Sequence, residues 1–328
     1  MEPLRIVSIG GGTGLSTLLQ GLKHFAGEPR QADLTAVVTV TDDGGSSGRL
    51  RRDFDVLPPG DIRNCMAALA EDEALLTRLF QYRFGGGQGL KGHSFGNLFL
   101  TALTHLTGDF AQAVRTSSEI LAIRGSILPA TAENVTLTAE LASGAIVRGE
   151  SRISRSRSRI RRIRLDPEVC MPLGETLEAI EQADLITIGP GSLFTSIVPN
   201  VLVEGIPEAL ARSRAIKACF VNMMWQPGET IDFSASDHIA AITEHAGGNF
   251  IDIAVLNTGE VSEALRLKYE EQRSRPVAND KERLEQMGIE VIGANLLSEG
   301  EKIRHNPEAA AEIAMALACR GRQRRTKQ

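Results

Sequence analysis

Short apolar runs rich in β-branched residues alternate along the chain with segments in which leucine and alanine recur at helical spacing. Runs that are apolar at every position are typical of strands buried on both faces of a parallel sheet. We expect such strands at residues 4–9, 34–40, 184–188, 215–221 and 251–256. Amphipathic helices are expected between them, for example at residues 15–25, 173–182 and 207–212. The alternation predicts an α/β, Rossmann-like, doubly wound and mostly parallel sheet.

Two stretches depart from this alternation. Residues of about 61–122 show only helical patterns, whereas about 126–166 switch to period two around a Ser-Gly turn, as in an antiparallel β-hairpin. We expect both to be excursions from a single nucleotide-binding domain over residues 1–328. A final amphipathic helix leads into a basic tail at about 320–328, which we expect to fray.

Arginines are dense at the end of the predicted hairpin. They are Arg152, Arg155, Arg157, Arg159, Arg161, Arg162 and Arg164. In a strand, the alternate arginines through Arg161 would line one face. One interpretation is a solvated edge strand whose charges prevent edge-to-edge pairing, and the other is a docking surface for an anionic partner. We favour the solvated edge strand, because charge runs usually form solvated surfaces.

Composition and charge narrow the class of protein. The chain has 328 residues, 42% hydrophobic and 23% charged, which is ordinary for a globular protein. Its aromatic content of 4% and net charge of −5 argue against a nucleic-acid partner. Four scattered cysteines without a C-x-x-C motif indicate neither a disulfide framework nor a zinc site. The chain start lacks a signal-peptide layout and no apolar run could span a bilayer, so we expect a cytoplasmic protein without a membrane partner.

A glycine-rich turn follows the first predicted strand. Gly11, Gly12, Thr13 and Gly14 lie between that strand and the next helix. Such turns bind phosphate because free N–H groups and the positive end of the helix dipole converge there. Thr13 is placed to cap the helix, to bind a phosphate oxygen, or both. Leu15 stands where the dinucleotide fingerprint requires its third glycine, which disfavours an NAD-dependent enzyme.

The second strand ends in two carboxylates followed by Gly-Gly-Ser-Ser-Gly-Arg. Gly45, Ser46 and Ser47 offer backbone and hydroxyl donors to a phosphate. Asp42 and Asp43 cannot bind phosphate directly, because like charges repel. Beside a phosphate they would hold a bridging Mg²⁺ or accept hydrogen bonds from a sugar or base. The plain alternative is an Asp-Gly turn in a solvated loop.

A second strand-to-glycine-turn unit lies in the other half of the predicted sheet. Gly189, Gly191 and Ser192 follow the strand at residues 184–188 and open onto a helix with further hydroxyl groups. Two turns of this kind suggest a ligand with phosphates and a polar sugar, gripped from both halves of the sheet.

The helical excursion contributes further polar residues. Asp61 is expected to cap a helix whose first turn carries Arg63 and Asn64. Residues 92–96 match the G-x-S-x-G nucleophile elbow, but the glycine-rich stretch before them cannot be the strand that the elbow requires. Ser94 therefore reads as a helix N-cap, and His93, Ser94 and Asn97 as ligand contacts at that helix start.

Several longer motifs occur in a fixed order. They are GGGTGLS at 10–16, TDDGGSSGRLR at 41–51, LPPGDIRNC at 57–65, GHSFGN at 92–97, GPGSLFTSIVPN at 189–200 and QPGET at 226–230. Together they resemble the bacterial YvcK-type gluconeogenesis factors. That group belongs to the superfamily of CofD, the 2-phospho-L-lactate transferase of coenzyme F420 synthesis. The resemblance extends from Ile6 to about Arg304.

The resemblance implies a Rossmann-like fold that binds UDP-sugars such as UDP-N-acetylglucosamine, with a role in carbon metabolism and cell shape. It implies that Thr13 and Asn200 contact the ligand, that Tyr269 stacks on or bonds the nucleotide, and that Arg304 pairs with its diphosphate. In the CofD branch the Asp42–Asp43 pair would hold the divalent metal. Trp225 departs from the expected pattern, where a smaller polar residue would stand, and so does the density of arginines between 152 and 164.

We therefore expect a UDP-sugar-binding regulatory protein that forms a homodimer. The alternative is a Mg²⁺-dependent phospho-transferase of the CofD type with a guanine nucleotide donor, in which Asp42 and Asp43 hold the metal and Arg49 or Arg63 stabilises the transferred charge. The expected ligand-binding residues are Gly11, Gly12, Thr13, Gly14, Asp42, Asp43, Gly45, Ser46, Ser47, Asn64, His93, Ser94, Asn97, Gly189, Gly191, Ser192, Asn200, Tyr269 and Arg304.

Overall fold

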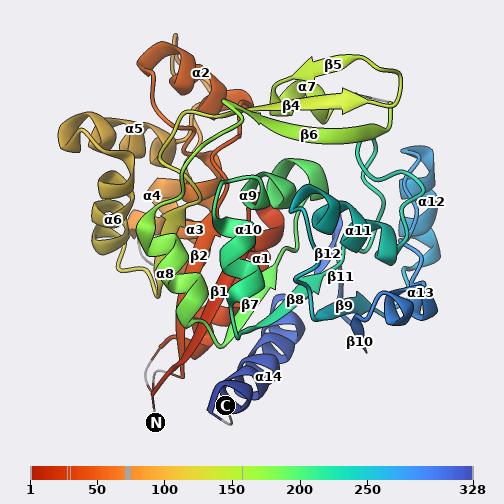
Figure 1. Cartoon of the computed structure of the whole chain (residues 1–328). Coiled ribbons are helices and arrows are strands. Elements are labelled where there is room, and N and C mark those ends of the chain that lie inside the picture. The colour runs from red at the N-terminus through yellow and green to blue at the C-terminus, as the bar shows by residue number, and fades with distance from the viewer. Residues whose placement is uncertain (1, 28, 30, 71–74, 157, 327–328) are drawn as a thin grey trace.

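A seven-stranded parallel sheet forms the centre of the molecule in a computed structural model (Figure 1). The structure describes all residues except 1, 28, 30, 71–74, 157 and 327–328. The strand order is β10-β9-β8-β7-β1-β2-β3. The strands are β1 (Leu4–Gly10), β2 (Ala32–Val38), β3 (Ser126–Pro129), β7 (Leu185–Ile188), β8 (Ile216–Phe220), β9 (Ile253–Asn257) and β10 (Glu290–Ala294). The α/β, Rossmann-like prediction is confirmed, because every neighbouring pair in this sheet is parallel.

The order of the strands creates a switch point between β1 and β7. From β1 the chain proceeds through β2 to β3 on one side, and from β7 it proceeds through β8, β9 and β10 on the other. The loops that leave β1 and β7 therefore diverge, which opens a crevice beyond their carboxyl ends. Each of these two strands runs into one of the glycine turns expected to bind phosphate.

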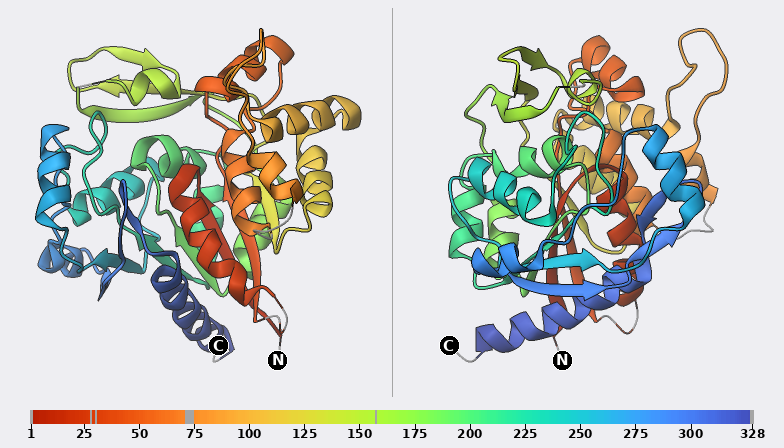
Figure 2. Two further views of the ribbon diagram at one scale, coloured as in Figure 1. Left: turned by 180° about the vertical axis from the view of Figure 1, so that it is seen from behind. Right: turned by 90° about the vertical axis from the view of Figure 1, so that its right-hand side faces the viewer.

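Helices cover both faces of the sheet (Figures 1 and 2). One layer contains α1 (Gly12–Leu22), α3 (Gly60–Leu69) and α14 (Pro307–Thr326), and α1 packs on both of the others. The other contains α8 (Gly174–Gln182), α10 (Ile206–Arg212) and α11 (Ala235–His245). Leucines of α1 such as Leu15, Leu18 and Leu22 are fully buried in the core, as their spacing predicts. No single helix among the described residues is both long and apolar enough to cross a membrane.

The helical excursion lies between β2 and β3. It contains α2 (Gly45–Phe54), α3, α4 (Leu75–Gln81), α5 (Phe95–Thr107) and α6 (Phe110–Ile120), in agreement with the all-helical pattern of this region. Helix α3 begins at Gly60 with Pro59 at its N-cap position, so the expectation that Asp61 caps it is wrong. Asp61 instead lies in the first turn, where its side chain faces the first glycine turn.

The antiparallel excursion begins later than expected, because Ser126–Pro129 pairs in parallel with β2 as an edge strand of the main sheet. Its strands β4 (Thr136–Leu141), β5 (Ile146–Arg148) and β6 (Ile160–Asp166) form a separate sheet in the order β5-β4-β6. Strands β4 and β5 form the predicted hairpin, and β6 is the other edge strand. This sheet and the short helix α7 (Glu150–Ile153) lie over the carboxyl ends of the parallel strands (Figure 1).

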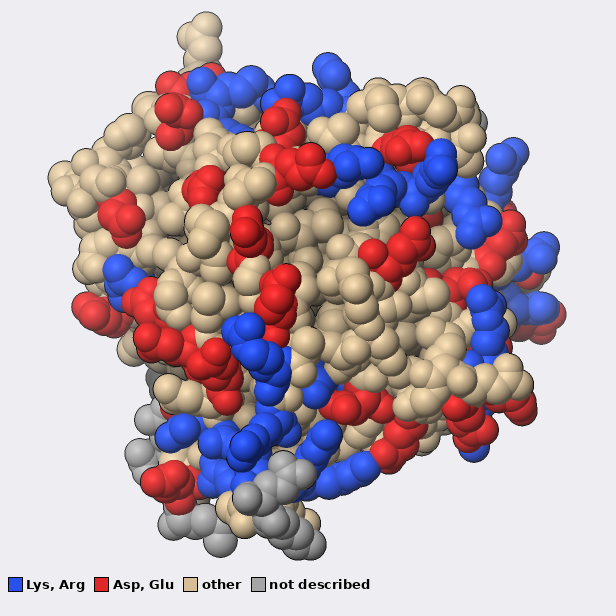
Figure 3. All heavy atoms as spheres, in the orientation of Figure 1, with Lys and Arg blue, Asp and Glu red and all other residues tan. Residues whose placement is uncertain are grey.

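The arginines of this sheet do not form one continuous stripe. Residues before Ile160 belong to α7 and a turn, and a bulge shifts the pairing beside Glu140, so alternate arginines do not share one face. Figure 3 shows basic side chains (Lys and Arg, in one colour) gathered over this sheet. Three of them face carboxylates, in the pairs Arg148–Asp166, Arg161–Glu140 and Arg164–Glu168. Arg157 lies outside the described residues.

The basic tail does not fray over most of its length. Helix α14 continues through Thr326, and its last turns are held by Asp184, whose side chain is fully buried. Arg322 and Arg325 both pair with that carboxylate, at 2.6 and 3.2 Å. A buried carboxylate requires such partners, and this requirement fixes the end of the helix.

The remaining elements lie outside the seven-stranded sheet. They are η1 (Lys23–Phe25), the π-helix η2 (Leu193–Ile197), α9 (Val198–Val201), α12 (Glu263–Glu271), α13 (Lys281–Gln286), β11 (Leu297–Glu299) and β12 (Ile303–His305). Strands β11 and β12 form an antiparallel hairpin. None of the residues of α12 is buried, and this helix is held to the hairpin by polar contacts that include Lys268 Nζ to the Glu301 carbonyl at 3.0 Å.

Candidate functional site

The first glycine turn passes directly from β1 into α1. Gly11 is the N-cap residue and has no side chain with which to cap α1. Gly12 adopts a φ of +62°, which favours glycine. Thr13 lies inside the first helical turn, so its expected role as the cap is wrong. The amino end of α1 therefore keeps free N–H groups that can bind an anion.

The second glycine turn lies against the first. A Cβ atom added to Gly14 would lie 2.5 Å from the Pro190 carbonyl oxygen and 2.8 Å from Gly191 Cα. Beyond this turn, the N–H groups of Ser196 and Ile197 both bond to the Ser192 carbonyl, in the π-helix. The two turns can approach this closely only because glycine occupies position 14.

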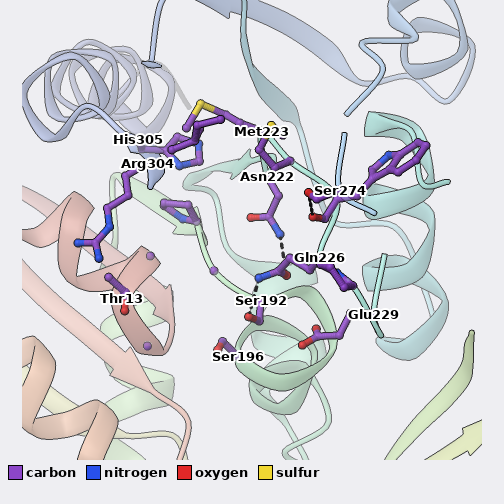
Figure 4. A pocket seen from close by; sticks show the side chains of 18 of the residues that line it. Thr13, Ser192, Ser196, Asn222, Met223, Gln226, Glu229, Ser274, Arg304 and His305 are labelled. Atoms are coloured by element: carbon purple, nitrogen blue, oxygen red, sulfur yellow. Dashed lines mark hydrogen bonds between the residues drawn. The ribbon is translucent and has the colours of Figure 1, made fainter. Parts of the chain in front are cut away.

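Together the turns line one cavity of about 490 Å³ (Figure 4). The expected site residues that line it are Gly11, Gly12, Thr13, Gly14, Gly191, Ser192, Tyr269 and Arg304. Arg304 projects from β12 toward Thr13 in Figure 4. Its guanidinium has no ion-pair partner among the residues that the structure describes. A guanidinium beside two turns that can bind anions is suited to a diphosphate.

Tyr269 reaches the cavity from α12. Its hydroxyl accepts a hydrogen bond of 2.9 Å from the Ile303 N–H, one residue before Arg304. The hydroxyl retains its own proton and can still donate it. Tyr269 therefore joins α12 to the strand that carries Arg304.

The opposite wall comes from the loop after β8, from which the sequence analysis named no ligand-binding residue. Asn222 donates to Gln226 Oε1 at 3.3 Å, and Gln226 donates to Ser192 Oγ at 2.9 Å (Figure 4). Trp225 also lines the cavity, and its indole N–H bonds to the Phe233 carbonyl. The QPGET motif was the available signal, because Gln226 and Glu229 both lie at this wall.

Glu229 is hydrogen-bonded to the π-helix that follows the second turn. Its carboxylate accepts hydrogen bonds of 3.2 Å from the Phe194 N–H and from Thr195 Oγ1. Burial raises the pKa of Glu229 to about 7, because a charged carboxylate is poorly solvated there. His305 also lines the cavity, and burial lowers its pKa to about 4, so it is neutral at physiological pH.

Asn200 and Gly189 do not line the cavity. Asn200 is fully buried behind the first turn, where its amide donates to the Gly10 carbonyl at 3.2 Å and to the Ser196 carbonyl at 2.8 Å. It ties the end of β1, just before the first turn, to the π-helix that follows the second turn. A direct contact between Asn200 and a ligand remains a prediction.

A pair of carboxylates lies beside the first turn. A Cβ atom on Gly11 would lie 2.7 Å from Asp61 Oδ2, and the Asp61 carboxylate accepts a backbone hydrogen bond from Gly12. Burial, and then the charge of Asp42, raise the pKa of Asp61 to about 7. The same two causes raise the pKa of Glu150, on α7.

Asp42 and Asp43 point to different partners. Asp42 Oδ1 accepts from the Gly44 N–H and Asp43 Oδ1 from the Ser151 N–H, each at 2.8 Å. Over the described part of the chain, no group of three or more His, Cys, Asp or Glu side chains is arranged to hold a metal ion. Mg²⁺ needs only one or two carboxylates when ligand phosphates complete its shell, so the metal assignment to this pair remains a prediction.

The chain matches a known protein family over most of its length. The model of 2-phospho-L-lactate transferase CofD matches residues 6–297. The chain belongs to the CofD family. It is 48% identical over 314 residues to the gluconeogenesis factor of Bacillus subtilis, covering 95% of this chain and 98% of that protein. The gluconeogenesis factor of Halalkalibacterium halodurans is 45% identical over 316 residues, covering 96% and 97%.

A solved structure of the family has the same fold. It is the crystal structure of a UPF0052 family member from Bacillus halodurans, which is 45% identical and superimposes with a TM-score of 0.91. The match covers 96% of this chain and 100% of that one. The resemblance predicted from the ordered motifs is thereby confirmed.

Seven further expected site residues do not line the cavity. They are Gly45, Ser46, Ser47, Asn64, His93, Ser94 and Asn97, and they gather where α2, α3 and α5 begin. Ser94 caps α5 as predicted, accepting from the Asn97 N–H at 3.2 Å. Residues 84–93 form only bends, turns and irregular backbone, and Ser94 itself makes one isolated bridge with Arg83, so no strand feeds a nucleophile elbow.

Proposed function

We infer that this CofD-family protein binds a UDP-sugar and acts as a regulatory protein in carbon metabolism and cell shape. The observation that carries the proposal is that one cavity joins two glycine turns with Arg304, which has no ion-pair partner among the described residues. Its volume of about 490 Å³ is in the range of small-molecule sites. Relatives that bear the name gluconeogenesis factor support the link to carbon metabolism.

The hydrogen-bonding groups of the cavity are suited to holding a sugar or base rather than to catalysing a reaction. The amides of Asn222 and Gln226 present donors and acceptors along one wall. Ser192 Oγ accepts its hydrogen bond from Gln226, an amide that cannot act as a base toward it. This arrangement supports binding without turnover.

Transfer of a phosphoryl-containing group is the second candidate, and the carboxylates beside the first turn favour it. Asp61 and Asp42 are held close enough for one to raise the pKa of the other. A divalent cation held there by one or two carboxylates and ligand phosphates would neutralise the charge on the phosphates. Arg63, in the same helical turn as Asp61, would stabilise the negative charge of the transferred group.

Calorimetry with the full chain separates the two candidates. UDP-N-acetylglucosamine, UDP-glucose, GDP and GTP are titrated with Mg²⁺ and with EDTA, and the products are analysed afterwards. The proposal predicts that UDP-sugars bind equally well with Mg²⁺ and with EDTA, and leave unchanged. A preference for guanine nucleotides that disappears in EDTA would refute it and support the transferase.

A further inference from the structure

A histidine joins the antiparallel sheet to the helical layer beneath it. Ile163 lies in the edge strand β6, and its N–H donates to His245 Nε2 at 3.0 Å, in the last turn of α11. His245 Nδ1 lies 2.7 Å from the Ala241 carbonyl oxygen, one turn earlier in the same helix. Because a carbonyl can only accept, Nδ1 carries the proton of the neutral ring and Nε2 is the acceptor. The imidazole therefore ties β6 to α11.

This bond exists only while the imidazole is neutral. A proton on Nε2 turns the acceptor into a donor, so that two N–H groups face each other and the bond from Ile163 is lost. The pKa of His245 lies below the ordinary value for histidine, mainly because of burial. Folding therefore favours the neutral ring. The bond is complete above about pH 6.5, the ordinary pKa of histidine, and is lost as the pH falls below it.

The charges around the ring oppose its protonation and would separate the two elements once it occurs. The charged residues that face it are Arg159, Arg161 and Arg162 from the sheet side and Asp237 and Glu244 from α11. Arg161 pairs with Glu140, and Asp237 pairs with Arg283. The π-helix and α9, residues 193–201, bring no charged side chain. A charged His245 would thus be repelled by Arg162 on β6, while the attraction of Glu244 stays within α11.

The sheet that His245 holds contributes to the wall of the cavity between the glycine turns. Ser154, in the segment that leads into β6, lines that cavity. A Cβ atom on Gly228, in the QPGET motif, would collide with the Ser156 carbonyl oxygen and lie 3.0 Å from that of Ser154. The His245 ring also meets Phe194 of the π-helix edge-on, with the ring centres 5.9 Å apart. The histidine therefore contacts the elements on both sides of the second glycine turn.

The other end of the sheet is fixed by contacts that do not titrate in this range. Arg51 on α2 donates to the Val135 carbonyl at 2.6 Å and to Thr136 Oγ1 at 2.9 Å, where β4 begins. An arginine keeps its charge throughout the range in which histidine titrates. In Figure 1 the sheet extends from α2 across to α11. Loss of the His245 bond would therefore free one end of the sheet and leave the other in place.

We propose that His245 is a pH-sensitive latch: the neutral ring holds β6 against α11, and its protonation releases β6 together with the segment that lines the cavity. A cavity of about 570 Å³ opens beside the ring between β6 and α11, which gives a proton access to it. The latch goes beyond nucleotide-sugar binding, because it operates whether or not a ligand is present. Its effect on affinity rests on the proposed function.

The first test is the NMR protection factor of the Ile163 amide in the ligand-free full chain, measured between about pH 8 and about pH 5. The protection factor corrects for the intrinsic pH dependence of hydrogen exchange. We expect it to fall by about 3- to 10-fold as the pH decreases, as for loss of one hydrogen bond. His245→Gln should keep the protection throughout, because an amide oxygen accepts the bond and does not titrate. His24→Gln, at an exposed histidine of η1, is the matched control and should behave like the parent.

Constant protection in the parent, or the same fall in His245→Gln, would overturn the latch. The titration of the parent needs no variant, so this result is available even if His245→Gln does not fold.

The second test is calorimetry of the same proteins with UDP-N-acetylglucosamine at the two ends of the pH range. The carboxyl groups beside the glycine turns titrate in parent and variant alike, so only the difference between the two reports His245. The parent should lose up to about 10-fold more affinity than His245→Gln, since the coupling cannot exceed the energy of the latch. Equal losses would overturn the link to the cavity. A pH-dependent protection factor in a chain that binds no UDP-sugar would refute the proposed function alone, and binding with constant protection would refute the latch alone.

Discussion

Gly14→Ala tests whether the two glycine turns hold the phosphates of one ligand jointly, an arrangement that we call the clasp. The added Cβ would lie 2.5 Å from the Pro190 carbonyl oxygen and 2.8 Å from Gly191 Cα, and neither backbone atom can rotate away. Overpacking of this kind costs about 1–3 kcal/mol, whereas alanine gains about 0.5–1 kcal/mol over glycine inside a helix. We therefore expect a net loss of up to about 2.5 kcal/mol in the free energy of unfolding. The turns must also separate, so the diphosphate loses at least one charged hydrogen bond and affinity falls by about 1.5–3 kcal/mol.

Gly174→Ala is the matched control, because Gly174 begins α8 and nothing lies within 4 Å of its Cβ position. It should change stability by less than about 1 kcal/mol and leave binding unaltered. Urea unfolding measures the first quantity and calorimetry with UDP-N-acetylglucosamine the second. Parent-like stability and affinity in Gly14→Ala would refute the clasp. Lost stability with retained affinity would show that the turns touch without jointly holding the ligand.

Three further changes test other parts of the account. Arg304→Ala should weaken UDP-sugar binding by about 1.5–3 kcal/mol with an unchanged melting temperature, and an unchanged affinity would remove Arg304 from the site. Arg322→Ala leaves the buried Asp184 with one partner fewer and should lower the free energy of unfolding by about 2–4 kcal/mol. Arg324→Ala is the control: it removes an exposed ion pair of 3.5 Å and should lower the same quantity by less than about 1 kcal/mol. Equal losses in the two variants would contradict this. Because the folded-state pKa of Asp61 is raised to about 7, its contribution is present below about pH 4 and is lost as the pH rises toward 7. Asp61→Asn should therefore flatten the fall in stability over that window in urea titrations, and an unchanged slope would refute the assignment.

The sequence predicted those parts of the site that depend on local chemistry. Glycine turns after buried strands could be recognised at Gly11–Gly14 and Gly189–Ser192, because the requirement for glycine is local. Ser94 was predicted as a cap for the same reason. Thr13 was misassigned because Gly11 can serve as the N-cap itself, which lets α1 begin three residues earlier than its apolar pattern suggests.

The parts that depend on tertiary packing were not predictable in this way. The wall formed by Asn222 and Gln226 takes its role from the loop after β8, and only the fold brings that loop to Ser192. The separation of Asn97 from the cavity likewise follows from how α5 packs on α2 and α3. Asp184 holds the last turn of α14 from 138 residues away, so a composition argument could only predict a frayed tail.

A crystal structure of the full chain with UDP-N-acetylglucosamine tests the central claim most directly. The account predicts that the diphosphate lies between Gly12–Gly14 and Gly191–Ser192, within hydrogen-bond distance of the Arg304 guanidinium. Density for the nucleotide at any other surface, with the two glycine turns left free of phosphate, would contradict it.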